Sequence, residues 1–172
     1  MLNVLVTGSN GQLGSEFKKI AYKFPNFNFF FKDIELDITK FDVIELFLNE
    51  NKIHVIINTA AYTKVNDAEI EKEKANAVNN ISVKNLVDLC EKYDCKLIHY
   101  STDYVYSGQD KKPISEKSSL NPVNYYGISK RNGETHIEKS CSESIILRTS
   151  WLYSSFGNNF VNSIIKKVQN KE

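Results

Sequence analysis

Four short segments of this 172-residue chain combine glycines, hydroxyls and an ammonium group in a way that suits nucleotide binding and carbonyl reduction. Glycines let backbone N–H groups approach a pyrophosphate at a helix N-terminus, and a positioned hydroxyl can protonate a carbonyl oxygen as a hydride arrives. The combination predicts a nicotinamide-dependent oxidoreductase. In chain order the segments are residues 8–14 (GSNGQLG), 58–61 (NTAA), 101–103 (STD) and 126–130 (YGISK).

Tyr126 and Lys130 are four residues apart, so on a helix they share one face. A neighbouring cation stabilises a phenolate, and the phenol can then serve as a proton donor. In a chain with nine tyrosines such a pair can also arise by chance. The alternative to a catalytic pair is a Tyr–Lys contact at the surface. Thr102, which follows directly on a predicted strand, favours the catalytic interpretation. We therefore predict Thr102, Tyr126 and Lys130 as catalytic residues.

The glycine segment follows a predicted strand and precedes a predicted helix, the context that a phosphate-binding loop requires. Its spacing is Gly-x-x-Gly-x-x-Gly, which differs from the Gly-x-Gly-x-x-Gly of the commonest dinucleotide fingerprint. A plain strand-to-helix turn would need one glycine rather than three. Gly8, Gly11 and Gly14 therefore predict a pyrophosphate site.

Acidic and basic residues after the second predicted strand leave the choice of cofactor open. Asp33 or Asp37 could bond an adenosine ribose hydroxyl, whereas Lys32 could attract a 2′-phosphate. Farther along, Trp151 and Tyr153 follow the fifth predicted strand. These aromatic rings could stack on a nucleotide or a sugar, or could form a hydrophobic plug at the sheet edge.

The histidines predict no metal site, because they are dispersed and lack ligand spacing. His99 lies inside a predicted strand, and we expect it to be a buried side chain with hydrogen-bond partners. Cys90, Cys95 and Cys141 form no Cys-x-x-Cys pair, which is typical of reduced thiols in a cytosolic protein.

Charge and hydropathy narrow the class of protein further. The chain has 22 basic and 21 acidic residues, so its charge favours neither nucleic acid nor an anionic membrane as a partner. No apolar run approaches the length of a membrane span, and the N-terminus reads as a strand rather than a signal peptide. We expect a cytoplasmic protein.

The elements that must position the four segments alternate between apolar strands and amphipathic helices. This alternation predicts one α/β domain over residues 1–172, a doubly wound parallel sheet of the Rossmann type with about five strands. All four segments would then lie near the carboxyl ends of strands, where such folds bind ligands. The irregular stretch 104–121 has the length of a lid or binding loop. Strands are expected at 2–7, 27–32, 53–58, 97–101 and 144–149, and helices at 13–22, 41–51, 71–93 and 160–169.

Several segments together resemble the dTDP-4-dehydrorhamnose reductases, which are extended short-chain dehydrogenase/reductases. The resemblance covers essentially the whole chain. It implies reduction of the C4 ketone of dTDP-4-dehydro-L-rhamnose to dTDP-L-rhamnose with NADPH or NADH, a step of deoxysugar-nucleotide biosynthesis. The segments are 7–14 (TGSNGQLG), 36–39 (LDIT), 58–63 (NTAAYT), 101–106 (STDYVY), 126–130 (YGISK), 148–153 (RTSWLY) and 157–160 (GNNF).

The resemblance also implies roles for individual residues. Tyr126 would donate the proton, Thr102 would hydrogen-bond the substrate oxygen, and Lys130 would bind the nicotinamide ribose and lower the pKa of Tyr126. Some related reductases use Mg²⁺ at a dimer contact, but no carboxylate cluster in this sequence identifies such a site. The cofactor would contact Gly8, Asn10, Gly11, Gln12, Leu13, Gly14, Asp37, Ile38, Ala60, Ala61, Tyr62, Tyr126 and Lys130. The nucleotide-sugar substrate would contact Thr63, Val65, Thr102, Asp103 and Trp151.

Two departures from the family pattern concern the substrate site. Asn66 stands where the family usually has an acidic residue, and Asp67 comes one position later. By comparison with the longer family members, we also expect the chain to lack most of the C-terminal substrate domain. We therefore expect a fragment of a longer protein, or the product of a truncated or split gene. It should bind NADP(H) but have weak or no reductase activity alone.

Without later strands, residues 144–149 would form an apolar edge strand. A homodimer or a complementing C-terminal chain could cover it.

Two alternative functions share the main motifs. Nucleotide-sugar epimerases and dehydratases carry the same glycines and Tyr-x-x-x-Lys, although residues 101–103 and 148–151 resemble the reductases more closely. The regulatory β subunit of methionine adenosyltransferase has the same fold and binds NADP without catalysis.

Overall fold

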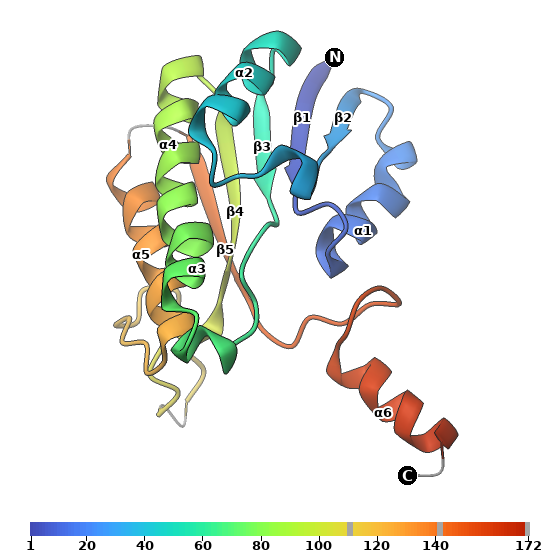
Figure 1. The fold of residues 1–172 in the computed structure, drawn as a ribbon, viewed down its shortest axis with the longest axis vertical. Coiled ribbons are helices and arrows are strands. Elements are labelled where there is room, and N and C mark those ends of the chain that lie inside the picture. The colour runs from blue at the N-terminus through green and yellow to red at the C-terminus, as the bar shows by residue number, and fades with distance from the viewer. Residues whose placement is uncertain (110–111, 141–142, 171–172) are drawn as a thin grey trace.

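The computed structural model describes residues 1–109, 112–140 and 143–170, and within them five strands form one parallel sheet (Figure 1). The order across the sheet is β2-β1-β3-β4-β5. Every neighbouring pair is parallel, which confirms the predicted fold class. The strands are β1 (Leu2–Thr7), β2 (Phe27–Phe31), β3 (Val55–Asn58), β4 (Lys96–Thr102) and β5 (Ser144–Thr149).

The strand order creates a switch point between β1 and β3. From β1 the chain moves outward to β2, and it then returns across the sheet to β3 on the other side of β1. In register, Thr7 at the end of β1 pairs with Asn58 at the end of β3. Loops that leave such a switch point in opposite directions open a crevice at the carboxyl ends of the strands.

Helices cover the two faces of the sheet unequally (Figure 1). α2 (Phe41–Asn51), α4 (Ser82–Tyr93) and α5 (Tyr125–Lys139) pack on one face over the main hydrophobic core. α1 (Gln12–Ile20) packs on the other face, where Phe17 contacts a smaller cluster around Val4, Val6 and Ile57.

One long helical segment, predicted over 71–93, is interrupted by a wider turn. α3 (Lys72–Asn76) continues through a π-helical turn (Ala77–Ile81) into α4. Such π-bulges insert an extra residue and often occur at functional sites. Here the bulge aims the Asn79 side chain at α5, where its Nδ2 donates to Ser129 Oγ at 3.0 Å.

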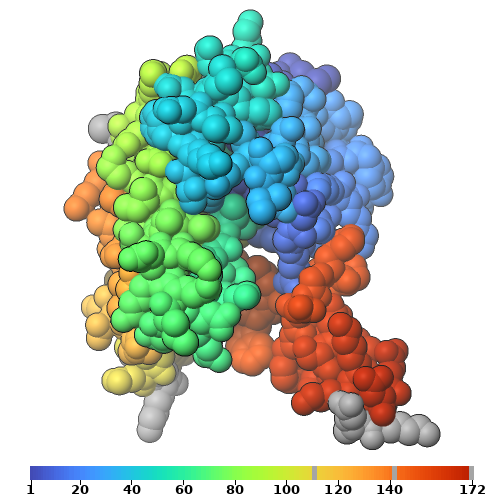
Figure 2. Space-filling model, in the orientation of Figure 1, coloured from blue at the N-terminus to red at the C-terminus, as the bar shows by residue number. Residues whose placement is uncertain are grey.

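The C-terminal segment stands out from the rest of the molecule (Figure 2). α6 (Phe160–Asn170) confirms the predicted helix, yet none of its described residues is buried. Its Phe160, Ile164 and Val168 side chains are exposed.

Cys90 and Cys95 are buried free thiols, as expected, and Cys141 lies outside the described residues.

In the parts of the chain that the structure describes, no helix is long and apolar enough to cross a membrane.

Candidate active site

The glycine loop lies at the switch point, between the end of β1 and the N-terminus of α1. Gly8 has a left-handed backbone with φ of +62°, and a Cβ atom there would lie 2.6 Å from the Ala60 backbone. A side chain is therefore excluded where the loop meets the end of β3. α1 begins after Gly11 with no side-chain cap among the described residues. Its first-turn N–H groups at Gln12 and Leu13 remain available to a phosphate.

Asp33, rather than Asp37, lies beside the glycine loop. Asp33 Oδ2 accepts a hydrogen bond from the Asn10 N–H at 3.2 Å, and Lys18 Nζ donates to Asn10 Oδ1 at 2.7 Å. The Asp37 carboxylate instead accepts from the backbone N–H and the hydroxyl of Thr39, which lower the pKa of Asp37. Ile38 is buried in the hydrophobic core.

The segment after β3 lies close to the glycine loop. Ala60 contacts the glycine loop through its backbone, as described above. The hydrogen bonds of Tyr62 are made with the helical segment that follows: its hydroxyl donates to Glu71 at 2.6 Å, and its N–H donates to Asn79 Oδ1 at 2.9 Å. The hydrogen bond to Glu71 is the main reason that the pKa of Tyr62 is raised to about 12.

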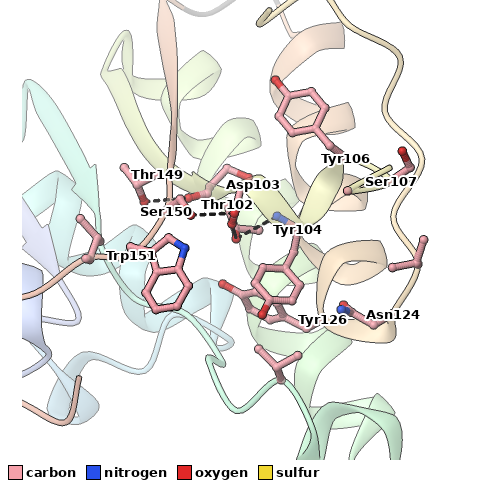
Figure 3. Close-up of a pocket in the computed structure, with 15 residues that line it drawn as sticks. Thr102, Asp103, Tyr104, Tyr106, Ser107, Asn124, Tyr126, Thr149, Ser150 and Trp151 are labelled. Atoms are coloured by element: carbon pink, nitrogen blue, oxygen red, sulfur yellow. Dashed lines mark hydrogen bonds between the residues drawn. The ribbon is translucent and has the colours of Figure 1, made fainter. Parts of the chain in front are cut away.

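A pocket of about 520 Å³ opens at the carboxyl ends of β4 and β5 (Figure 3). This volume is in the range of small-molecule sites. Of the described residues, neither Thr63 nor Lys130 lines the pocket. The predicted substrate and catalytic residues that the pocket does bring together are Val65, Thr102, Asp103, Tyr126 and Trp151.

Thr102 and Tyr126 present their hydroxyls in this pocket. Thr102 Oγ1 accepts from the Tyr104 N–H and donates to Asp103 Oδ1, both at 3.2 Å, while Asp103 Oδ2 accepts from Ser150 Oγ at 2.6 Å. The Tyr126 ring packs edge-on against Tyr104. Burial raises the pKa of Tyr126, and the Thr102 hydroxyl acts in the opposite direction.

Lys130 lies one turn after the pocket-lining Tyr126 on α5 and is almost fully buried. Its Nζ donates to Tyr100 O at 2.7 Å and lies 3.2 Å from His99 Nε2. Burial lowers the pKa of Lys130 to about 8, against an opposing effect of Glu134. The resemblance implied a lowered pKa for Tyr126, whereas burial of the phenol raises its pKa here and only the Thr102 hydroxyl acts in the opposite direction. His99 is buried with partners on both ring nitrogens, as expected.

Two sets of hydrogen bonds that the sequence did not predict join elements near the site. Arg148 donates from Nε and Nη2 to the two oxygens of the buried Glu134 carboxylate, each at 2.8 Å, and from Nη1 to the Tyr106 hydroxyl at 2.9 Å. This pairing joins β5, α5 and the loop after β4. Asn159 Nδ2 donates to Gln12 Oε1 at 2.9 Å, which brings the C-terminal segment onto the glycine loop. Neither pair has a periodic signal in the sequence.

Within the described residues, no group of three or more histidine, cysteine, aspartate or glutamate side chains is arranged to hold a metal ion.

Strand order, the glycine loop at the switch point and the adjoining pocket together define a Rossmann-like α/β protein. The model of the family described as "RmlD substrate binding domain" matches residues 2–172, so the chain belongs to this family. A curated relative, the dTDP-4-dehydrorhamnose reductase of Aggregatibacter actinomycetemcomitans, is 36% identical over 173 residues. The match covers all of this chain and 59% of the relative.

Solved structures agree in fold. A dTDP-4-dehydrorhamnose reductase from Bacillus anthracis in complex with NADP superposes with a TM-score of 0.95 at 36% identity, over all of this chain and 62% of that one. A dTDP-glucose 4,6-dehydratase from the same organism, in complex with NAD, has a TM-score of 0.85 at 21% identity, covering all of this chain and 63% of that chain. The second similarity concerns the fold alone. The chain thus spans about three-fifths of the relatives that it matches.

Proposed function

We propose that this chain is a dinucleotide-binding domain that carries the catalytic residues for reducing the C4 ketone of dTDP-4-dehydro-L-rhamnose to dTDP-L-rhamnose. The observation that carries the proposal is the pocket that Thr102 and Tyr126 both line, at the same sheet edge as the glycine loop. The names of the relatives that match over the whole chain support the substrate. The remaining part of the site would come from a segment or a partner beyond these residues.

NADPH or NADH would be held by the glycine loop, the α1 N-terminus and the residues after β3. The bound nicotinamide supplies the hydride. Asp33 and Lys18 flank Asn10 of the loop, so we propose these side chains beside the adenosine ribose. The chain contributes both signs of charge there, which fits a site that accepts either dinucleotide.

The protein residues would manage the proton and the developing charge. Tyr126 is a neutral phenol, a form that burial favours further by raising its pKa, and this neutral form would donate a proton to the ketone oxygen. The Thr102 hydroxyl would hydrogen-bond the same oxygen and orient it. Lys130 would hold the nicotinamide ribose and oppose the charge left on Tyr126. General acid catalysis of this kind contributes roughly 10²- to 10⁴-fold in rate.

Calorimetry with NADPH tests the cofactor site. We expect the chain to bind NADPH and Gly11→Asp to abolish binding, because a carboxylate at the α1 N-terminus would repel the pyrophosphate. Asn132→Asp adds the same charge on an exposed position of α5 and should leave binding unchanged. Absence of binding by the unsubstituted chain at millimolar concentrations would sink the proposal.

Product analysis tests the reaction. With the chain at high concentration, dTDP-4-dehydro-L-rhamnose and NADPH should form dTDP-L-rhamnose slowly, and Tyr126→Phe should lose at least about 10²-fold of that rate while still binding NADPH. Interconversion of sugars without net NADPH oxidation would point to an epimerase. Tight NADPH binding with no turnover, even when the C-terminal part of a relative is added, would point to a regulatory subunit.

A further inference from the structure

A line of buried polar groups runs across the sheet from the glycine loop to Lys130. Thr7 Oγ1 donates to Asn58 Oδ1 at 2.7 Å, and Asn58 Nδ2 lies 3.0 Å from His99 Nδ1. His99 Nε2 then lies 3.2 Å from Lys130 Nζ, which also donates to Tyr100 O. Register places the first three side chains on neighbouring strands, because Thr7 pairs with Asn58 and Asn58 pairs with His99. All of the side chains in this line are buried.

The hydrogen-bond capacity of a neutral imidazole allows this line two arrangements. One ring nitrogen carries a proton, so the ring accepts a hydrogen bond at one nitrogen and donates at the other. With the Asn58 amide as it stands, Nδ1 accepts, and Nε2–H points at Lys130, which must be a neutral amine to accept it. If Lys130 is an ammonium, it donates to Nε2, and Nδ1–H then requires the amide oxygen of Asn58.

We propose that this line reverses its hydrogen-bond direction when Lys130 gains or loses a proton, with His99 neutral in both arrangements. On protonation the Nε2 proton moves to Nζ, the incoming proton resides on Nδ1, and the Asn58 amide turns over to donate to Thr7. His99 is therefore a positioning residue for Lys130. Because Thr7 immediately precedes Gly8, the arrangement couples the charge of the lysine to the first residue of the glycine loop.

The charges around Lys130 and His99 agree with this reversal. Lys130 is faced by His99 from β4, and Tyr126 and Glu134 lie one turn before and after it on α5. Burial outweighs Glu134, which is paired with Arg148, and lowers the pKa of Lys130 to about 8. Burial and the neighbouring lysine hold the pKa of His99 well below its usual range. Lys130 therefore titrates in an accessible range while the imidazole stays uncharged.

Two-bond ¹H–¹⁵N correlation spectra of the histidine rings, recorded without added dinucleotide from roughly pH 6 to roughly pH 10, test the proposal. The His99 signals are identified by their loss in His99→Gln and by cross-relaxation with the Lys130 side chain. We expect the Nδ1–H tautomer at the low end of this pH range and the Nε2–H tautomer at the high end, with a midpoint at about pH 8. His54 and His136 serve as internal references.

Lys130→Met is the deciding variant, since it keeps the length of the side chain without a titrating group. In this variant the His99 tautomer should not depend on pH. A single tautomer throughout the wild-type titration, an imidazolium, or a midpoint that persists in Lys130→Met overturns the proposal. The wild-type spectra decide the matter on their own if the variant does not fold.

The consequence for the cofactor rests on the proposed function. A dinucleotide whose ribose hydroxyls contact Lys130 should favour the ammonium form, so saturating NADPH should move the midpoint upward. Bound NADPH with an unchanged midpoint would overturn the coupling to the cofactor. Failure of NADPH to bind would contradict the proposed function but not the tautomer change, which is measured without it.

Discussion

At the scale of single residues, Lys130 combines a position beside the catalytic hydroxyls with an unfavourable environment for charge. Burial holds its pKa at about 8, below the ordinary value of 10.5. Between these values the unfolded chain binds more protons than the folded chain, so the free energy of unfolding should rise with pH across this interval. Functional sites often retain such groups although they lower stability.

Lys130→Met should therefore stabilise the fold near pH 7, on the order of 2 kcal/mol after the lost hydrogen bond to Tyr100 is counted. The rise in stability between about pH 8 and about pH 10.5 should disappear as well. Urea unfolding at both ends of this interval measures the two effects.

Comparing the pH dependence of unfolding of Lys130→Met with that of the wild type removes the contribution of other titrating groups. Burial raises the pKa of Cys90 to about 12 and of Cys95 to about 11, so both thiols make the fold less stable as the pH rises above 9. Because they are present in both proteins, the difference isolates Lys130. Equal pH slopes in the two proteins would contradict this account of Lys130.

At the scale of elements, the position of α5 depends on its contact with the π-helical turn Ala77–Ile81. A Cβ atom at Gly133 would lie 2.3 Å from the Asn79 carbonyl oxygen, so α5 approaches the turn more closely than any side chain permits. At this contact Asn79 Nδ2 donates to Ser129 Oγ of α5, and it also donates to Tyr62 O in the segment after β3. The contact thus helps to set where α5 places Tyr126.

Gly133→Ala should destabilise the fold by about 1 to 3 kcal/mol, because the methyl group forces α5 away from the turn. Helix propensity alone would predict the opposite sign. Asn132→Ala, on the exposed side of the same helix, is the matched control and should be neutral or slightly stabilising. Chemical unfolding measures both variants. A Gly133→Ala protein as stable as wild type would show that the close approach is not required.

At the scale of the whole molecule, the two faces of the sheet differ in what covers them. On the face that carries α1, Ile98 and Tyr100 of β4 pair in register with Ile145 and Leu147 of β5. Ile145 is 55% exposed and Leu147 is 39% exposed, and β5 is the edge strand that the sequence predicted. An apolar edge of this kind is a template for association.

We expect the purified chain to self-associate in a concentration-dependent manner and Ile145→Lys to reduce this association. Because the side chain is largely exposed, stability should change by less than about 0.5 kcal/mol. Ile70→Lys introduces the same change at an isoleucine that is 89% exposed and lies outside the sheet. Sedimentation velocity compares the three proteins. A monomer at all concentrations, or equal effects of the two substitutions, would contradict the role of β5.

Much of the fold was predictable because its signals are local. The bounds of β1, α2 and β5 agree with the sequence prediction, since apolar periodicity and turn residues act between neighbours along the chain. The glycine segment and residues 101–103 lie at strand ends for the same reason. The alternation of strands and helices by itself predicts that these two segments lie at one edge of a parallel sheet.

What the sequence determined by itself was the kind of element at each place and the kind of chemistry at the strand ends. The tertiary structure alone decided which polar groups meet. It brought Asp33 rather than Asp37 to the glycine loop, joined His99 to Lys130 across 31 residues, and joined Gln12 to Asn159 across 147 residues. These contacts depend on strand order, register and helix packing, which arise from long-range burial and leave no spacing that can be read along the chain.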